Sequence, residues 1–270
     1  MKTRIIAAVV LLPLLLLIVL AAPKVFTAIL FGLMAAIAAY ELLRSTRLVT
    51  HTRLSIYSMV SAFWCALWSG LHIGYAWLLL GILIFWVALF AEMMRDQENV
   101  TFTGVGLCMV AGTVIPLLLS SLVRLHAMDK GRFYILLPFV MAFMSDTGAY
   151  FAGLNFGKRK LAPTISPKKT VEGVIGGVIA AVLGVIIYGL ILNVFFDMTV
   201  NFLYAFAYGA LGALAGVFGD LCFSVIKRQT GIKDYGNLIP GHGGILDRFD
   251  SMIVVGPLAE VLMLILPLAV

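Results

Sequence analysis

Four aspartates lie at or near the ends of long apolar segments, where ionisable side chains are rare. A carboxylate inside a membrane helix costs about 2.5–3.5 kcal/mol on insertion scales, so a functional role is the default interpretation of each one. These aspartates border two loops that are rich in basic residues, glycine and proline, at residues 155–170 and 227–250. We therefore expect the two loops to meet at one membrane face, with Asp146, Asp220, Asp247 and Asp250 beside them.

Asp220 gives the clearest helical pattern, because Ser224 and Lys227 follow it four and seven positions later. Residues at these spacings share one face of a helix, so the three side chains are predicted to point toward the loop at 227–250. A structural alternative stays open, in which Asp220 and Lys227 only neutralise each other in the membrane. Asp146 has the same two interpretations.

A glycine-rich turn precedes the last apolar segment, where residues 241–244 read Gly-His-Gly-Gly. Glycine permits the dihedral angles that bring main-chain N–H groups close to a phosphate. Asp247 and Asp250 follow three residues apart, and two carboxylates on one helical face suit a hard cation such as Mg²⁺. In such a turn we expect His242 to be a hydrogen-bond donor rather than a metal ligand.

Carboxylates combined with lysine and arginine favour phosphoryl or nucleotidyl transfer, in which bound cations reduce the repulsion between two anions. The sequence shows no Ser-His-Asp arrangement and no paired cysteine and histidine, which argues against acyl transfer. The glycines before Lys158 do not fit GxxxxGK[ST], and no Ser or Thr follows that lysine. P-loop chemistry is therefore unsupported.

The elements that position these residues must be membrane helices. Hydrophobic residues make up 62% and charged residues 12% of the 270 residues, against about 25% charge in soluble domains. About 20 apolar residues cross the hydrocarbon as a helix, and we predict an all-α, polytopic helix bundle. The nine predicted spans are 5–22, 25–43, 54–70, 73–94, 103–125, 133–153, 172–196, 202–226 and 251–270.

Loop charge predicts the orientation, because loops rich in Lys and Arg stay in the cytoplasm. A cytoplasmic N-terminus places all but four of the 19 Lys and Arg residues inside, and nine crossings then put the C-terminus outside. The net charge of +6 therefore reflects topology and anionic lipid or phosphate partners before nucleic acid. A cleaved signal peptide is the alternative for the first span, although its apolar run is long for a signal core.

The sequence of residues 224–250, SVIKRQTGIKDYGNLIPGHGGILDRFD, resembles the signature of the phosphatidate cytidylyltransferase family with every spacing kept. A second block, from DTGAYF at 146–151 through Gly157-Lys158 to SPKKT at 166–170 and Glu172-Gly173, is similar to the same family. Together the two blocks cover the C-terminal half from about residue 145. Two positions depart from the family pattern: Phe223 replaces a common acidic residue, and Val171 replaces a common tryptophan.

The resemblance implies transfer of the cytidylyl group of CTP to phosphatidate, which yields CDP-diacylglycerol and pyrophosphate by in-line attack on the α-phosphorus. It also implies Mg²⁺, a second metal site that a monovalent cation could fill, and a homodimer. Loop charge predicts that the active site lies at the cytoplasmic face of the cell membrane. We expect residues 1–132 to form a transmembrane scaffold with a role in dimerisation or lipid access, and 133–270 to form the catalytic region. On this basis we assign Asp220, Lys227, Asp247 and Arg248 to catalysis, Asp220, Asp247, Asp250 and Asp146 to the metal, and Ser224, Arg228, Lys233, His242, Gly243, Gly244, Lys168 and Lys169 to substrate binding.

Two other functions stay open on the sequence alone. A CTP-dependent kinase of a lipid alcohol would need the same metals and basic residues, but it would phosphorylate a hydroxyl group. A membrane transporter could use Asp146, Asp220 and Glu260 as coupling groups, although it would place its carboxylates near the middle of the membrane. The products separate the two enzymes: CDP-diacylglycerol and pyrophosphate in one case, CDP and a lipid phosphate in the other.

Overall fold

The computed structural model describes residues 13, 15–71, 73–239, 241 and 243–269. In these ranges the chain is an all-α polytopic membrane protein, with seven helical segments long and apolar enough to cross a membrane. Contacts between Cα atoms divide the chain into two units. The first unit comprises residues 1–132 and 229–249, and the second comprises residues 133–228 and 250–270.

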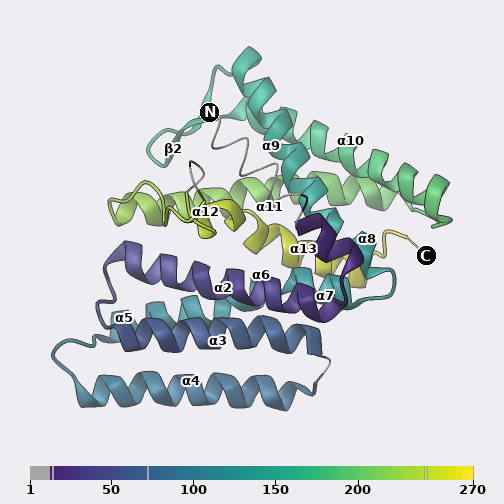
Figure 1. Ribbon diagram of the computed structural model, residues 1–270. Helices are drawn as coiled ribbons and strands as arrows, with labels where there is room; N and C mark the ends of the chain where they lie inside the picture. The colour runs from purple at the N-terminus through teal and green to yellow at the C-terminus, as the bar shows by residue number, and fades with distance from the viewer. Residues whose placement is uncertain (1–12, 14, 72, 240, 242, 270) are drawn as a thin grey trace. The chain divides into compact units, whose positions relative to one another are not determined.

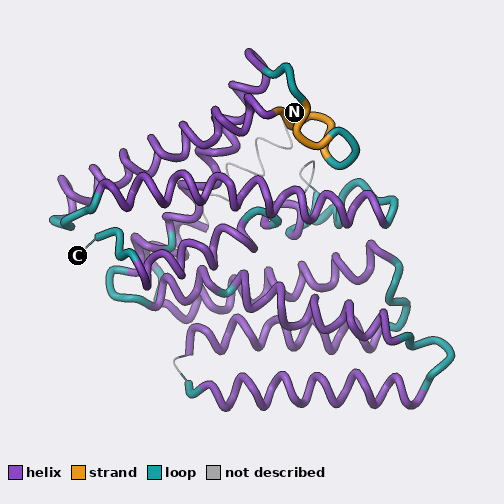
Figure 2. The backbone as a smooth tube through the Cα atoms, turned by 180° about the vertical axis from the view of Figure 1, so that it is seen from behind, coloured by secondary structure: helices purple, strands orange, loops and turns teal. Residues whose placement is uncertain are grey.

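Three long helices run side by side in the first unit, with α2 packed on α3 and α3 on α4 (Figures 1 and 2). Small residues let these helices approach closely, as membrane helices require: a Cβ on Gly70 would overlap Ala28 of α2. Helix α4 buries only Phe85 and Leu89, so most of its apolar surface faces outward, as a bilayer solvent allows. The bounds are α2 Lys24–Thr46, α3 Thr52–Leu71 and α4 Tyr75–Arg95.

The next membrane segment, Phe102–Ala127, is interrupted. Pro116 lacks the N–H that an α-helix would direct to the carbonyl of Gly112, and that carbonyl accepts a hydrogen bond from Cys65 Sγ at 3.9 Å. Neighbouring helices commonly satisfy backbone groups that proline frees in a membrane. The segment consists of α5 Phe102–Met109, the π-helix η1 Val110–Val114, α6 Ile115–Leu119 and α7 Ser121–Ala127, and the short helix α12 Leu246–Phe249 completes the unit.

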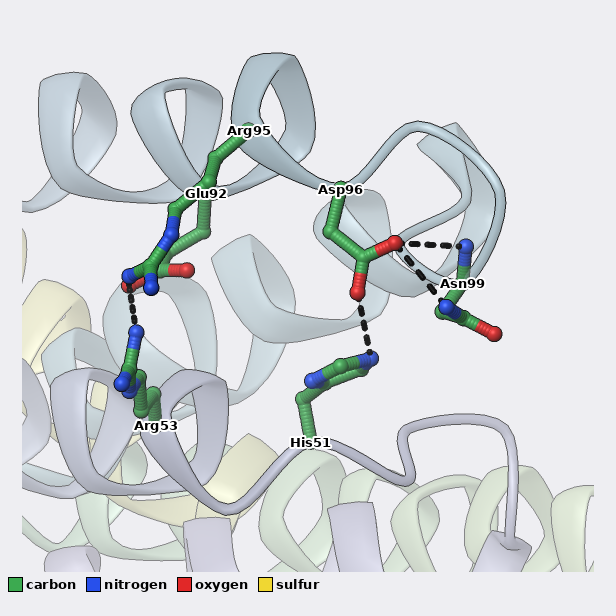
Figure 3. Close-up of polar contacts among 6 residues, drawn as sticks. All are labelled: His51, Arg53, Glu92, Arg95, Asp96 and Asn99. Atoms are coloured by element: carbon green, nitrogen blue, oxygen red, sulfur yellow. Dashed lines mark hydrogen bonds and ion pairs between the residues drawn. The ribbon is translucent and has the colours of Figure 1, made fainter.

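Polar side chains fasten the C-terminal end of α4 to the start of α3 (Figure 3). Glu92 Oε1 accepts a hydrogen bond from Tyr57 Oη at 3.1 Å and lies 3.4 Å from Arg53 Nη1. In the adjoining loop, Asp96 Oδ2 lies 3.5 Å from His51 Nε2. These side-chain contacts help to hold the ends of α3 and α4 together.

The second unit packs α9 against α10 through glycine and alanine. A Cβ on Gly148 would stand 2.6 Å from the carbonyl oxygen of Gly176, and one on Gly209 would stand 2.7 Å from the main-chain nitrogen of Val182. The close approach of α10 to both α9 and α11 therefore depends on small residues. Helix α8, Gly131–Tyr134, precedes α9 Leu136–Phe156, α10 Val171–Phe196, α11 Phe202–Gln229 and α13 Met252–Ile265.

The predicted spans agree with the structure to different degrees. The second to eighth each correspond to one long helical segment, whereas half of the first lies outside the described residues. The last is shorter than expected, because α13 has 14 residues, contains Pro257 and ends at Ile265. The number of crossings and their orientation stay predictions.

The sequence analysis treated residues 155–170 as a loop, and the structure shows a β-hairpin within them. Strands β1 Lys160–Ala162 and β2 Ser166–Thr170 pair antiparallel. Pro163 lies in the turn between them, where its fixed φ favours chain reversal. The hairpin ends directly at the start of α10, so Lys168 and Lys169 stand on a defined strand.

Candidate active site

Asp220 and Lys169 form an ion pair between α11 and the hairpin. The Lys169 ammonium contacts Asp220 Oδ2, and the two side chains are 24% and 33% exposed. One turn further along α11, Ser224 Oγ donates a hydrogen bond to Asp220 Oδ1 at 3.4 Å. The predicted common face of Asp220 and Ser224 is therefore confirmed, and Lys169 is a partner that helical spacing could not suggest.

Hydrogen bonds hold the hairpin at both its base and its tip. At the base, Glu172 Oε2 accepts the main-chain N–H groups of Lys158 and Arg159, each at 3.1 Å. At the tip, Arg228 Nε of α11 donates to the carbonyl oxygen of Ile165 at 3.0 Å. These contacts hold the backbone of the hairpin, and from β2 the Lys169 ammonium reaches Asp220 and, at 3.5 Å, the carbonyl oxygen of Val217.

Asp250 lies close to Asp220 within the second unit. A Cβ on Gly219, the residue before Asp220, would stand 2.9 Å from the main-chain oxygen of Asp250. The Asp250 side chain is buried, and its Oδ1 accepts the N–H of Ser251 at 2.8 Å. Asp146 lies on an exposed side of α9. The main chain therefore brings Asp220 and Asp250 together.

Asp247 belongs to the first unit and is held by main-chain groups. Its Oδ2 accepts the N–H of Tyr235 at 2.8 Å and the N–H of Gly244 at 3.0 Å, and the residue is 7% exposed. Gly243 has φ +87°, and a Cβ there would stand 2.9 Å from Asp247 Oδ2. Glycine at 243 therefore serves both the left-handed backbone and the close approach of the carboxylate.

A cavity of about 460 Å³ opens in the same loop. Its lining combines cations with three glycines, whose main chain can approach a ligand closely. Side-chain cations and accessible backbone N–H groups together are the usual means of binding a phosphate chain. The lining residues are Lys233, Asp234, Gly236, Asn237, Ile239, Gly241, Gly243 and Arg248.

Glu41 is a residue that the sequence analysis missed. It is 5% exposed in α2, and its carboxylate accepts hydrogen bonds from the main chain of Ile245 and Leu246, just before Asp247. The signal was present, because Glu41 is a carboxylate within a predicted membrane span, the same feature that marked Asp220. It went unused because the basic residues that follow it, Arg44, Arg47 and Arg53, served only to predict the orientation.

The structure distributes the predicted site residues over the two units. Those in the first unit line or support the cavity: Lys233, Gly243, Gly244, Asp247 and Arg248. His242 lies outside the described residues. Those in the second unit belong to α9, the hairpin, the end of α11 and the start of the last segment: Asp146, Lys168, Lys169, Asp220, Ser224, Lys227, Arg228 and Asp250.

The carboxylates fit the way in which proteins commonly bind Mg²⁺, with few protein ligands. Among the described residues, no group of three or more His, Cys, Asp and Glu side chains could enclose a metal ion. Mg²⁺ is commonly held by one or two carboxylates while substrate phosphates and water complete its shell. Within the second unit, Asp220 and Asp250 provide two carboxylates suited to that mode. Within the first unit, Asp247 provides one.

The fold and these residues define a class: a polytopic α-helical membrane protein whose polar groups are of the types that bind phosphates and divalent cations. The sequence model of the Cytidylyltransferase family matches residues 2–266. The chain belongs to this family.

Several curated relatives share the name phosphatidate cytidylyltransferase. The protein of Bacillus subtilis (strain 168) is 36% identical over 178 residues, which are 63% of this chain and 65% of the relative. Those of Staphylococcus aureus (strain COL) and Staphylococcus saprophyticus are 42% and 40% identical over 136 residues, 50% of this chain and 51% of each relative. The chain thus spans between about half and two thirds of the length of the relatives it matches.

Proposed function

We propose that the protein is a phosphatidate cytidylyltransferase, which transfers the cytidylyl group of CTP to phosphatidate. The observation that carries this proposal is the buried Asp247 held in a glycine-rich loop beside a cavity lined by Lys233 and Arg248. The names of the curated relatives support the same reaction. The cytoplasmic location of the site and a homodimer are further proposals that rest on loop charge and family resemblance.

The reaction needs little proton transfer. A phosphate monoester has a second pKa near 6, so the lipid phosphate is already largely deprotonated at neutral pH. Its oxygen attacks the α-phosphorus of CTP, the bond to the β-phosphate oxygen breaks, and pyrophosphate leaves with the electron pair. The protein's task is then to position two anions and to reduce their repulsion.

The loop of the first unit is proposed to bind the triphosphate. Lys233 and Arg248 on the cavity wall hold phosphate oxygens by charge-assisted hydrogen bonds. The left-handed turn at Gly243 brings the main chain to the wall of the same cavity. Gly244 supports the triphosphate site through its N–H, which donates to Asp247. Binding the leaving pyrophosphate there lowers the barrier, because the developing charge meets groups that are already oriented.

The polar residues of the second unit are proposed to serve the lipid phosphate and the metal. Lys168 and Lys169 of β2 and Lys227 and Arg228 of α11 provide cations, and Ser224 provides a hydroxyl group. Lys169 is neutralised by Asp220 in the absence of substrate, so an incoming phosphate competes for an ammonium that is already in place. The ion pair therefore keeps a lysine oriented without a substrate present.

Asp220 and Asp247 are the proposed Mg²⁺ ligands, with Asp250 and Asp146 as further candidates. When bound, Mg²⁺ neutralises phosphate charge and aligns the attacking and leaving oxygens. The protein's own contribution is to hold the carboxylates: Asp247 by two main-chain N–H groups and Asp220 by Ser224 and Lys169.

Product analysis tests the proposal directly. The purified protein is incubated with radiolabelled CTP, phosphatidate and Mg²⁺, and we expect labelled CDP-diacylglycerol and unlabelled lipid-free pyrophosphate from α-labelled CTP. Conversion of CTP to CDP with phosphorylation of an added lipid alcohol, and with no lipid nucleotide, would identify the kinase alternative instead. Omission of Mg²⁺ with a chelator present should abolish the lipid nucleotide.

A further inference from the structure

Glu41 contacts the signature loop through both of its carboxylate oxygens. Oε1 accepts the main-chain N–H of Ile245 at 3.0 Å, and Oε2 accepts the N–H of Leu246 at 2.8 Å. The residue is 5% exposed, near the C-terminal end of α2. A buried carboxylate is costly unless it is well hydrogen-bonded, and these two bonds satisfy it with groups that lie more than 200 positions away in the chain.

Two glycines of the signature make room for this carboxylate. A Cβ on Gly236 would stand 2.8 Å from Glu41 Cδ, and a Cβ on Gly244 would stand 2.5 Å from the same atom. Real Cβ atoms essentially never approach so closely. The loop therefore wraps around Glu41 from two sides, and the family's glycine spacing has a steric explanation in this contact.

Three consecutive main-chain N–H groups connect Glu41 to Asp247. Gly244 N–H donates to Asp247, Ile245 N–H to one oxygen of Glu41, and Leu246 N–H to the other. The two carboxylates thus accept the N–H groups of three consecutive residues in one turn. Any movement of Ile245 or Leu246 also moves the donor that orients Asp247.

We propose that Glu41 is a positioning residue of the active site, which holds the signature loop so that Asp247 and the cavity keep their geometry. This inference rests on the proposed function. Both oxygens of Glu41 accept loop N–H groups, so the residue acts through the loop and not on the substrate. The role requires two acceptors, which a carboxylate has and the single oxygen of a carboxamide does not.

Glu41→Gln is therefore the informative change, because it keeps the size of the side chain and replaces one acceptor by a donor that faces an N–H group. We expect amide hydrogen exchange in residues 236–249 to rise at least tenfold in the purified full chain. We also expect kcat/KM for CTP to fall about 10- to 100-fold, the usual effect of removing a supporting hydrogen bond from a metal ligand.

Glu92→Gln is the matched control, since Glu92 is also a carboxylate of the first unit, with a side chain that is 16% exposed, and pairs with Arg53 (Figure 3). It also accepts a hydrogen bond from Tyr57. This control should leave exchange in residues 236–249 and the KM for CTP unchanged.

Gly244→Ala should cause the same defect as Glu41→Gln, because it disturbs the same contact from the loop side. The activity of the double variant should lie within twofold of the more impaired single variant, since both changes break the same contact.

The exchange measurement separates the two proposals. Unchanged exchange in Glu41→Gln would overturn the positioning role, whatever the activity. A wild-type chain that forms no CDP-diacylglycerol would overturn the proposed function, while the exchange difference would still show whether Glu41 holds the loop. Equal amide exchange in residues 236–249 of Glu41→Gln and Glu92→Gln would also reject the proposal, since the effect would then not be specific to the contact between Glu41 and the loop.

Discussion

The two units each hold a candidate metal-binding aspartate, but by different means. In the first unit, buried Asp247 accepts two main-chain N–H groups, and the loop that supplies one of them is itself held by Glu41. In the second, Asp220 is about one third exposed and pairs with the flexible side chain of Lys169. Main-chain bonds fix a carboxylate rigidly, whereas a lysine can exchange its partner. We infer that the first unit is preorganised and that the second responds to substrate.

Removal of either aspartate's charge should have the largest effect. We expect Asp247→Asn and Asp220→Asn each to lower the rate of CDP-diacylglycerol formation by about 100-fold or more, the scale of losing one electrostatic group in a transition state. Asp129→Asn, in an exposed turn, is the control and should stay within twofold of wild type. Full activity in either test variant would remove that residue from the proposed metal site.

Gly243→Ala should have the next largest effect on activity, and it tests whether the first unit is preorganised. Its Cβ would press on Asp247 Oδ2 at 2.9 Å, in addition to the strain of φ +87°. Gly231→Ala is the matched control, because Gly231 has φ +70° but no atom within 4 Å of the added Cβ. We expect a fall in kcat of about 10- to 100-fold for the first variant.

The control should show a loss of thermal stability from backbone strain of about 1–2 kcal/mol, with kcat within threefold of wild type. Equal effects of the two alanine variants on kcat would mean that backbone strain alone matters, and that contact with Asp247 does not.

Lys169→Gln should have an intermediate effect on activity, and it should act on the KM for phosphatidate more than on kcat. If Lys169 exchanges from Asp220 to a lipid phosphate, its loss should raise the KM for phosphatidate about tenfold while kcat changes less. Activity of the wild type should also fall as salt is raised at subsaturating phosphatidate, because partly exposed ion pairs are screened. A change confined to kcat would show that Lys169 only orients Asp220 and does not bind the lipid phosphate. The second unit would then be preorganised like the first.

Arg228→Gln should give the smallest effect. The residue is exposed, and its Nε donates to the carbonyl oxygen of Ile165 at the hairpin tip, so we expect a two- to fivefold rise in KM for phosphatidate and faster proteolysis within residues 158–170. Lys160→Gln, an exposed cation at the base of the same hairpin, is the comparison and should leave the cleavage rate unchanged. Equal cleavage rates of the Arg228→Gln variant and wild type would show that this hydrogen bond does not protect the hairpin from proteolysis.

The sequence predicts what repeats regularly along the chain. Helical periodicity placed Ser224 on the face of Asp220, and apolar length located seven of the spans. Contacts between distant segments leave no such trace: nothing in the spacing indicates that Lys169 reaches Asp220, or that Glu41 reaches Ile245. The hairpin was missed because two short polar strands lack the alternation of a half-buried strand. Pro257 helps to explain why the last span was overestimated.

The contact between Glu41 and residues 245–246 also affects the order in which parts of the chain can fold during synthesis. Its partners are separated by more than 200 positions, and at synthesis rates of 5–20 residues per second the loop follows α2 by roughly 10–40 s. Through that interval the helix carries a carboxylate into the membrane without the donors that later satisfy it. The glycine loop therefore cannot be held by Glu41 until long after α2 has been made, and the cavity in this loop cannot take its final form before then.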